Sequence, residues 1–89
     1  MLTINIEIIN RLGLHARAAA KFVQIAAGYT CEIAVEKGAK KVNGKSIMGL
    51  MMLAASEGST LAITTTGDDA DSALAALIDL INSKFGESE

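Results

Sequence analysis

The sequence predicts an α+β fold: an open-faced β-sandwich, in which a four-stranded antiparallel sheet carries three helices on one face. Two observations lead to this prediction. Apolar and polar residues alternate in each strand-like segment, so each strand should bury one side and expose the other. Between these segments, apolar residues recur at helical spacing, which gives the order β-α-β-β-α-β-α.

The first half of the chain supplies a strand, a helix and a hairpin. Residues 2–8 alternate between apolar and polar side chains, which predicts a strand. In residues 16–27 apolar side chains recur at i, i+3, i+4 and i+7, which predicts a helix that ends before Gly28. Residues 31–36 alternate again, and 40–43 follow a turn as a short polar run, which predicts a hairpin.

The second half of the chain supplies a short helix, the last strand and a long helix. Ser46 is of the type that caps a helix start, and apolar residues at helical spacing follow it. Residues 61–66 are rich in β-branched side chains, which favours a strand. An apolar stripe over residues 74–85 predicts the final helix, which Asp68 or Asp69 should cap.

The length and composition indicate one domain over residues 1–89. Eighty-nine residues have room for one hydrophobic core, and 51% of them are hydrophobic, which is enough to fill it. The last four residues, 86–89, end in small and charged side chains and should fray. We therefore expect an independently folded domain with a loose C-terminal tail.

The charge and hydropathy patterns exclude several classes of partner. A formal net charge of -2 has the wrong sign for a protein that must neutralise many nucleic-acid phosphates. No apolar stretch approaches the roughly 18 residues of a membrane-spanning helix, and the N-terminus lacks the features of a signal peptide. We expect a soluble cytoplasmic protein without membrane insertion.

Metal and redox chemistry is also disfavoured. Cys31 is the only cysteine, so it has no partner for a disulfide or a CxxC pair, and it should be a small core residue in a reducing compartment. With one histidine as well, the chain lacks the ligands for a zinc site and the members of a Ser-His-Asp triad. We expect no metal and no cofactor.

The single histidine, His15, stands where a glycine-containing loop enters the first predicted helix. The N–H groups and the dipole at a helix start favour an anion, yet the first turn holds Arg17 and no carboxylate. A neutral imidazole there offers a nucleophilic nitrogen, and the guanidinium could stabilise a transferred phosphoryl group. From these residues alone, a solvated turn histidine beside a surface arginine is an equally good interpretation.

Two motifs resemble those of a known family. Residues 13–17, Gly-Leu-His-Ala-Arg, are similar to the phosphoacceptor motif of the histidine-containing phosphocarrier proteins (HPr) of the bacterial phosphotransferase system. Residues 43–49, Asn-Gly-Lys-Ser-Ile-Met-Gly, are similar to the second, serine-bearing motif of that family. The length and the order of the elements also agree with the family, so the resemblance covers nearly the whole chain.

The resemblance implies a phosphoryl carrier. It implies that His15 accepts a phosphoryl group from phosphorylated enzyme I, through its δ1 nitrogen, and donates it to enzyme IIA domains. It also implies that the Arg17 side chain and the backbone N–H groups of Ala16 and Arg17 contact the phosphate. The chain departs from the family motif at Ala18, where the family normally has proline.

Ser46 has two possible roles. It is a helix cap, or it is also a regulatory phosphorylation site for HPr kinase/phosphorylase, as the resemblance implies for many family members. A P-loop interpretation of Gly44-Lys45-Ser46 fails, because a Walker A motif needs a glycine where Ala39 stands.

The apolar pattern of the second predicted helix indicates a docking face. Ile47, Met48 and Met51 fall on one side of it, and Leu50 and Leu53 fall on the other, so one set should be less buried. The resemblance favours the first set as the surface for enzyme I and the IIA domains, whereas the alternative is that all five belong to the core.

Two functions remain open at this point. The first is a monomeric carrier that forms transient complexes, because a carrier must leave both its donor and its acceptor. The second is a non-catalytic regulatory binding module of the same fold, controlled through Ser46. The presence of both His15 and Arg17 favours the carrier.

Overall fold

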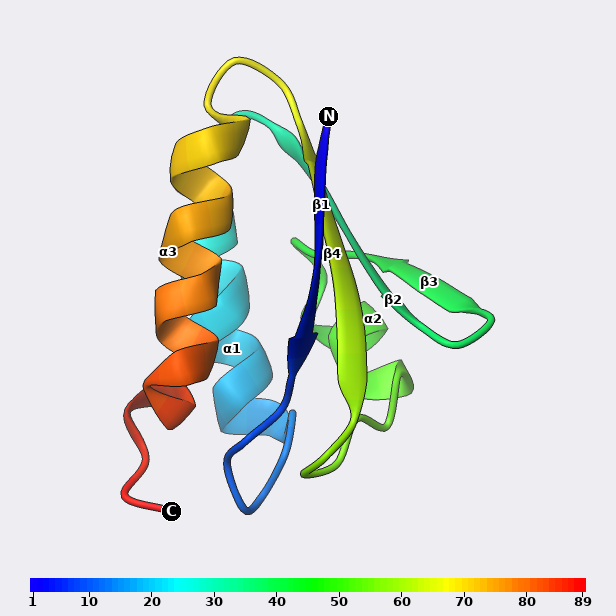
Figure 1. Cartoon of the computed structure of the whole chain (residues 1–89), viewed down its shortest axis with the longest axis vertical. Helices are drawn as coiled ribbons and strands as arrows, with labels where there is room; N and C mark the ends of the chain where they lie inside the picture. The colour runs from blue at the N-terminus through cyan, green and yellow to red at the C-terminus, as the bar shows by residue number, and fades with distance from the viewer.

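The computed structural model describes residues 1–89, which fold in the order β1, α1, β2, β3, α2, β4 and α3 (Figure 1). The strands are β1 (Leu2–Glu7), β2 (Glu32–Lys37), β3 (Lys40–Asn43) and β4 (Thr60–Thr66). The helices are α1 (Ala16–Ala26), α2 (Ile47–Met52) and α3 (Ala70–Asn82), and a short 3-10 turn, η1 (Lys84–Gly86), follows them. The predicted α+β fold and its order of elements are confirmed.

The four strands form one antiparallel sheet in the order β1-β4-β2-β3. The last strand, β4, is central, with Ile63 opposite Ile4 of β1 on one side and Val35 of β2 on the other. Helices α1 and α3 lie side by side against one face of the sheet (Figure 1), and α2 packs against α1 and β3. The other face is polar, and the hydroxyls of Thr3 and Thr64 lie 2.9 Å apart on it.

The core lies between the sheet and the helices. Phe22 of α1, Ile63 of β4 and Leu77 of α3 have no exposed surface. Each such side chain contributes about 1.5–3 kcal/mol by leaving water. None of the helices is long and apolar enough to cross a membrane.

The final helix ends earlier than its apolar stripe predicted. It stops at Asn82, and Lys84 and Phe85 then adopt left-handed φ angles of 59° and 55°. Phe85 is nevertheless fully buried, so its predicted place in the apolar core is correct although its helical conformation is wrong. Burial of the phenylalanine contributes about 1.5–3 kcal/mol, which offsets part of the cost of about 1–3 kcal/mol for each left-handed non-glycine residue.

The C-terminal tail is docked, so the prediction that residues 86–89 fray was wrong. The backbone N–H of Arg11 donates to the carbonyl oxygen of Glu89 at 2.5 Å, and the Arg11 guanidinium donates to the Glu89 carboxylate at 2.6 Å. The Nζ of Lys21 donates to the carbonyl oxygen of Phe85 at 2.6 Å. These partners are far apart in sequence, and a local pattern contains no sign of them.

Asp69 occupies the predicted position before α3, but its side chain does not cap that helix. Its carboxylate instead accepts the backbone N–H groups of Thr30 at 2.8 Å and Cys31 at 2.9 Å, which ties α3 to the start of β2. These hydrogen bonds, that from Thr30 above all, lower the pKa of the Asp69 carboxyl. Cys31 is buried as predicted, and burial, followed by the hydrogen bond to Asp69, raises the pKa of its thiol.

Candidate functional site

His15 lies immediately before the first residue of α1, in extended backbone conformation. Its carbonyl oxygen accepts the N–H of Ala19 at 2.8 Å, which starts the helix. No side chain caps this end, and the first turn contains no acidic residue. The N–H groups of Ala16 and Arg17, the first two helical residues, have no acceptor within a helix, so this end of α1 suits an anion.

The loop that presents His15 is held rigidly. Gly13 has a φ of 68°, and a Cβ atom there would lie 2.5 Å from the carbonyl oxygen of Ala55. Only glycine fits both conditions. Leu14 donates its N–H to the same Ala55 oxygen at 2.8 Å. The segment that follows α2 therefore fixes the backbone on which His15 is mounted.

An acidic side chain from the far end of the sequence contacts the His15 ring. The Nε2 atom of His15 is hydrogen-bonded to Oε2 of Glu87. A carboxylate can only accept, so Nε2 carries the proton and donates it. Burial by itself raises the pKa of Glu87, but hydrogen bonds from His15 and Asn10 outweigh burial and hold the pKa of this carboxyl below its usual range.

Sequence reasoning missed Glu87. The residue is 72 positions from His15 in the chain and belongs to the tail that was expected to fray. No local pattern signals such a contact.

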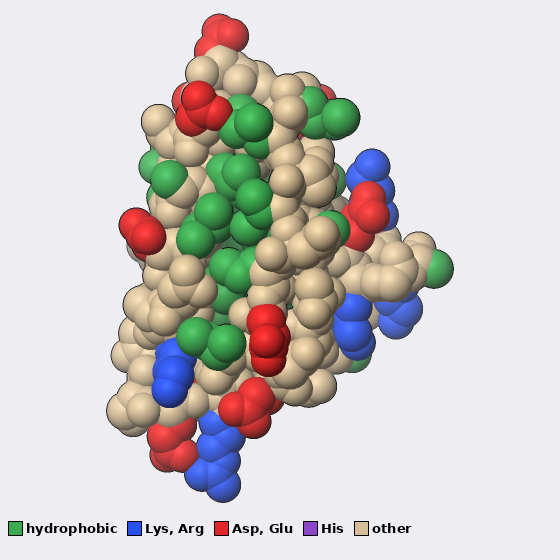
Figure 2. All heavy atoms as spheres, viewed as in Figure 1, with side chains coloured by type: hydrophobic (Ala, Val, Ile, Leu, Met, Phe, Trp, Pro, Cys, Tyr) green, Lys and Arg blue, Asp and Glu red, His purple; other side chains and the backbone are tan.

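Arg17 is exposed on the first turn of α1, and its guanidinium forms no hydrogen bond or ion pair. It lines a shallow hollow of about 470 Å³ together with Leu12 and Glu87. Acidic and basic side chains both gather at this lower end of the molecule, where the C-terminus lies (Figures 1 and 2). The structure thus places an unpaired cation on the second residue of α1, two positions after His15.

Ser46 caps α2. Its Oγ atom accepts the backbone N–H of Gly49 at 3.0 Å, and its side chain is half-buried. The predicted capping role is therefore present in the structure. Gly49 is accommodated at a tight spot, since a Cβ there would lie 3.2 Å from the Cβ of Val42.

Helix α2 divides its apolar side chains between the core and the surface. Leu50 and the following Leu53 are buried, whereas the exposed residues are Ile47 at 41%, Met48 at 72% and Met51 at 43%. Met52 on the same helix and Leu12 are also exposed, and neither was predicted to be. Leu12 lies in the loop before His15, and no helical period could indicate its exposure.

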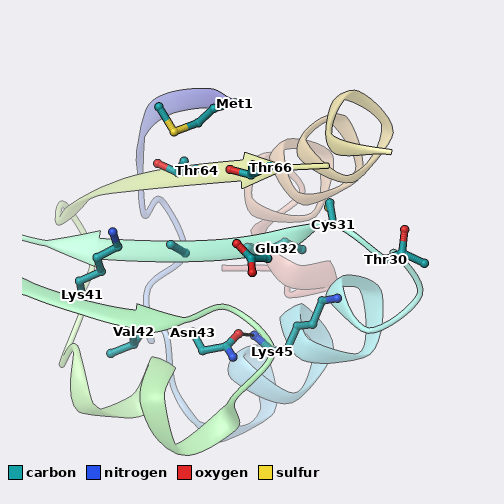
Figure 3. A pocket seen from close by; sticks show the side chains of 12 residues that line it. Met1, Thr30, Cys31, Glu32, Lys41, Val42, Asn43, Lys45, Thr64 and Thr66 are labelled. Atoms are coloured by element: carbon teal, nitrogen blue, oxygen red, sulfur yellow. Dashed lines mark hydrogen bonds between the residues drawn. The ribbon is translucent and has the colours of Figure 1, made fainter. Parts of the chain in front are cut away.

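A second hollow lies on the open face of the sheet, away from α1 and α3 (Figure 3). Its lining includes Glu32, Lys41, Thr64 and Thr66, and none of the predicted site residues. No group of His, Cys, Asp and Glu side chains in the chain could hold a metal ion. Because no predicted site residue lines this hollow, it is separate from the site around His15.

Comparison with known proteins identifies the family. Residues 2–83 match the family model described as the PTS HPr component phosphorylation site. The chain belongs to the HPr family. It is 56% identical to the phosphocarrier protein HPr of Neisseria meningitidis over 89 residues, and 52% identical to that of Pseudomonas aeruginosa over 90 residues. Both alignments cover all of each chain.

Solved HPr structures agree with the fold. A crystal structure of HPr-C-His from Thermoanaerobacter tengcongensis has a TM-score of 0.96 and 53% sequence identity over all of both chains. A structure described as an HPr dimer from the same organism has a TM-score of 0.79 and 54% identity, covering 98% of this chain and 100% of that one. Since a relative forms a dimer, the monomeric state predicted from sequence stays a prediction.

Ala18, which replaces the proline of the HPr motif, gives a test of the first turn of α1. It is the third residue of the helix, where the N–H has no acceptor within the helix and the φ of proline is compatible. We expect Ala18→Pro to stabilise the protein by about 0.4–1 kcal/mol, because proline restricts the unfolded chain. Denaturant unfolding measures this change. Destabilisation would show that the fully buried Ala18 has no room for the larger ring.

Proposed function

We propose that this HPr-family chain is a cytoplasmic phosphoryl carrier that accepts a phosphoryl group from phosphorylated enzyme I on His15 and donates it to enzyme IIA domains. One observation carries the proposal: His15 stands at an uncapped helix start, and the first turn of that helix carries the unpaired guanidinium of Arg17. An imidazole supplies the nucleophile, and the helix start and the guanidinium supply an anion site.

The hydrogen bond to Glu87 supports Nδ1 as the nitrogen that reacts. Because Nε2 carries a proton and donates a hydrogen bond to Glu87, the free lone pair of His15 is on Nδ1. This lone pair attacks the phosphorus, a bond forms between Nδ1 and phosphorus, and the bond to the donor atom of enzyme I breaks with its electron pair returning to that atom. Transfer to a IIA domain reverses these roles.

The charge of the transferred group is stabilised by this chain alone. The N–H groups of Ala16 and Arg17 point out of the helix start, and the Arg17 guanidinium donates charge-assisted hydrogen bonds to phosphoryl oxygens. The donor supplies an activated phosphoryl group, so the step uses no cofactor and no metal.

The surface beside the site fits several partners. The exposed side chains of Ile47, Met48 and Met51 form an apolar patch on α2, and flexible thioethers adapt to differently shaped surfaces. A shallow hollow lined by His15, Leu12 and Ala54 joins the site to the segment after α2. We assign this face to the docking of enzyme I and IIA domains.

Incubation with phosphoenolpyruvate and enzyme I tests the proposed function directly. Intact mass should increase by one phosphoryl group, and omission of enzyme I should prevent the increase. A chain that binds enzyme I without gaining mass would instead be a regulatory binding module.

Regulation through Ser46 gives a second test. HPr kinase/phosphorylase would place about 1.5 to 2 negative charges at the edge of the apolar patch, which docking must then desolvate. We expect Ser46→Asp to weaken binding of enzyme I by about tenfold, or about 1.4 kcal/mol. The fold should survive, because a carboxylate can also accept the N–H of Gly49.

Calorimetric titration with enzyme I and thermal melting, measured on the same Ser46→Asp sample, check this prediction. Ser46→Asn is the matched control, since it keeps an acceptor at the helix start and adds no charge. Equal affinities of the two variants would leave Ser46 with its capping role alone.

A carrier that alternates between partners should be a monomer when no partner is present. The apolar patch on α2 is small and is needed for docking, so its burial between two copies would block transfer. Size-exclusion chromatography with light scattering should give the mass of one chain. A stable dimer at micromolar concentration would contradict this expectation.

A further inference from the structure

The Glu87 carboxylate is fixed at both of its oxygens. Oε2 accepts from Nε2 of His15, and Oε1 accepts from Nδ2 of Asn10 at 3.0 Å. The same Asn10 amide group donates to the carbonyl oxygen of Gly13 at 2.8 Å, and Asn10 has no exposed surface. One buried amide therefore joins the C-terminal tail to the loop that carries His15.

The tail is anchored on both sides of Glu87. Before it, Phe85 is fully buried and its carbonyl oxygen accepts Nζ of Lys21. After it, Glu89 pairs with the backbone and the guanidinium of Arg11. In Figure 1 the tail and the start of α1 meet at the same end of the molecule. The contact with His15 therefore belongs to a docked segment and not to a free chain end.

We infer that Glu87 is a positioning residue for His15: it holds the imidazole with its proton on Nε2 and with Nδ1 facing the phosphoryl donor. This inference rests on the proposed function. Glu87 lies outside both family motifs, residues 13–17 and 43–49. Its carboxylate contacts His15 through one oxygen and Asn10 through the other.

The Glu87 carboxylate also stabilises the positive charge that the His15 ring gains during the transfer. When Nδ1 forms its bond to phosphorus, the ring keeps the proton on Nε2 and becomes an imidazolium. The adjacent Glu87 carboxylate balances that positive charge in a site with little exposure, 27% for the histidine side chain and 15% for the glutamate. Groups that hold a reactive ring through its other nitrogen contribute in this way to reactivity.

Three variants separate these effects. Glu87→Ala removes both the acceptor and the charge, and Glu87→Gln keeps an acceptor oxygen while it removes the charge. Glu89→Gln is the control, because it alters the same tail away from His15, keeps the backbone hydrogen bond to Arg11 and retains a side-chain oxygen for the Arg11 guanidinium. Each is compared with the wild-type chain by nitrogen-15 NMR of the imidazole at about pH 8.5, where an ordinary histidine is neutral, and by steady-state transfer from enzyme I.

We expect the wild-type chain, Glu87→Gln and Glu89→Gln to carry the ring proton on Nε2, and Glu87→Ala to show a mixture of both tautomers. Transfer by Glu87→Ala should lose about tenfold in kcat with KM for enzyme I changed by less than about twofold, and Glu87→Gln should lie between it and the wild type. Glu89→Gln should transfer at the wild-type rate.

Any of three results for Glu87→Ala would overturn the inference: a wild-type tautomer pattern, a transfer loss confined to KM, or no transfer loss at all. Failure of the proposed function is a distinct outcome, since a wild-type chain that accepts no phosphoryl group still reports its tautomer by NMR.

Discussion

His15→Ala should abolish phosphoryl acceptance from phosphoenolpyruvate and enzyme I. His15 is the only histidine, and no other nucleophile lies at the uncapped start of α1. Cys31 cannot substitute, because its thiol is buried and burial raises its pKa. Intact mass after incubation should show the unmodified chain only.

The fold of His15→Ala should remain intact. The His15 side chain makes no capping hydrogen bond, so the start of α1 does not depend on it. Thermal melting close to that of the wild type is the control for the loss of acceptance. In the wild type, acid treatment should remove the added phosphoryl group, since a bond between nitrogen and phosphorus is acid-labile. A phosphoryl group gained by His15→Ala, or one that survives acid in the wild type, would refute the assignment.

Arg17→Ala should slow transfer by about a hundredfold, or about 2.7 kcal/mol in the barrier, the loss typical of removing one donor aimed at developing charge. Binding of enzyme I should change far less, because the guanidinium forms no hydrogen bond or ion pair within the chain and its proposed partner is the phosphoryl group. Single-turnover rates and calorimetric titration separate the two quantities.

Arg17→Lys is the matched variant, since it keeps the charge and loses the planar fork that contacts two oxygens at once. We expect it to recover part of the rate. Loss of binding in proportion to loss of rate would assign Arg17 to docking and not to the phosphoryl group.

Local patterns were sufficient to predict the elements of this fold. The alternation of residues 2–8 corresponds to β1 at Leu2–Glu7, and the helical period of 16–27 corresponds to α1 at Ala16–Ala26. Each pattern reflects one buried face, and that face is a property of neighbouring residues. The predicted end of the last helix was wrong at Phe85. Burial of the Phe85 side chain after a left-handed turn produces the same apolar stripe as a longer helix.

The site was predictable where one segment carries it. His15 and Arg17 share a helix start, so their proximity follows from adjacent positions in the chain. Glu87 reaches His15 and Asn10 from 72 and 77 positions away in the chain, so no local pattern indicates these contacts. The prediction that the Asp69 side chain caps α3 was wrong for the same reason. Asp69 accepts hydrogen bonds from Thr30 and Cys31, which lie 39 and 38 positions earlier.

The docked tail has a practical consequence for labelling the protein. A purification tag or fluorescent fusion joined after Glu89 would leave the molecule beside His15, where Glu87 sits and partners must approach. Met1 is 89% exposed and lies at the opposite end of the molecule (Figure 1). An extension at Met1 therefore leaves the transfer site open. An extension after Glu89 would instead lie beside His15 and could alter the transfer rate that the experiment measures.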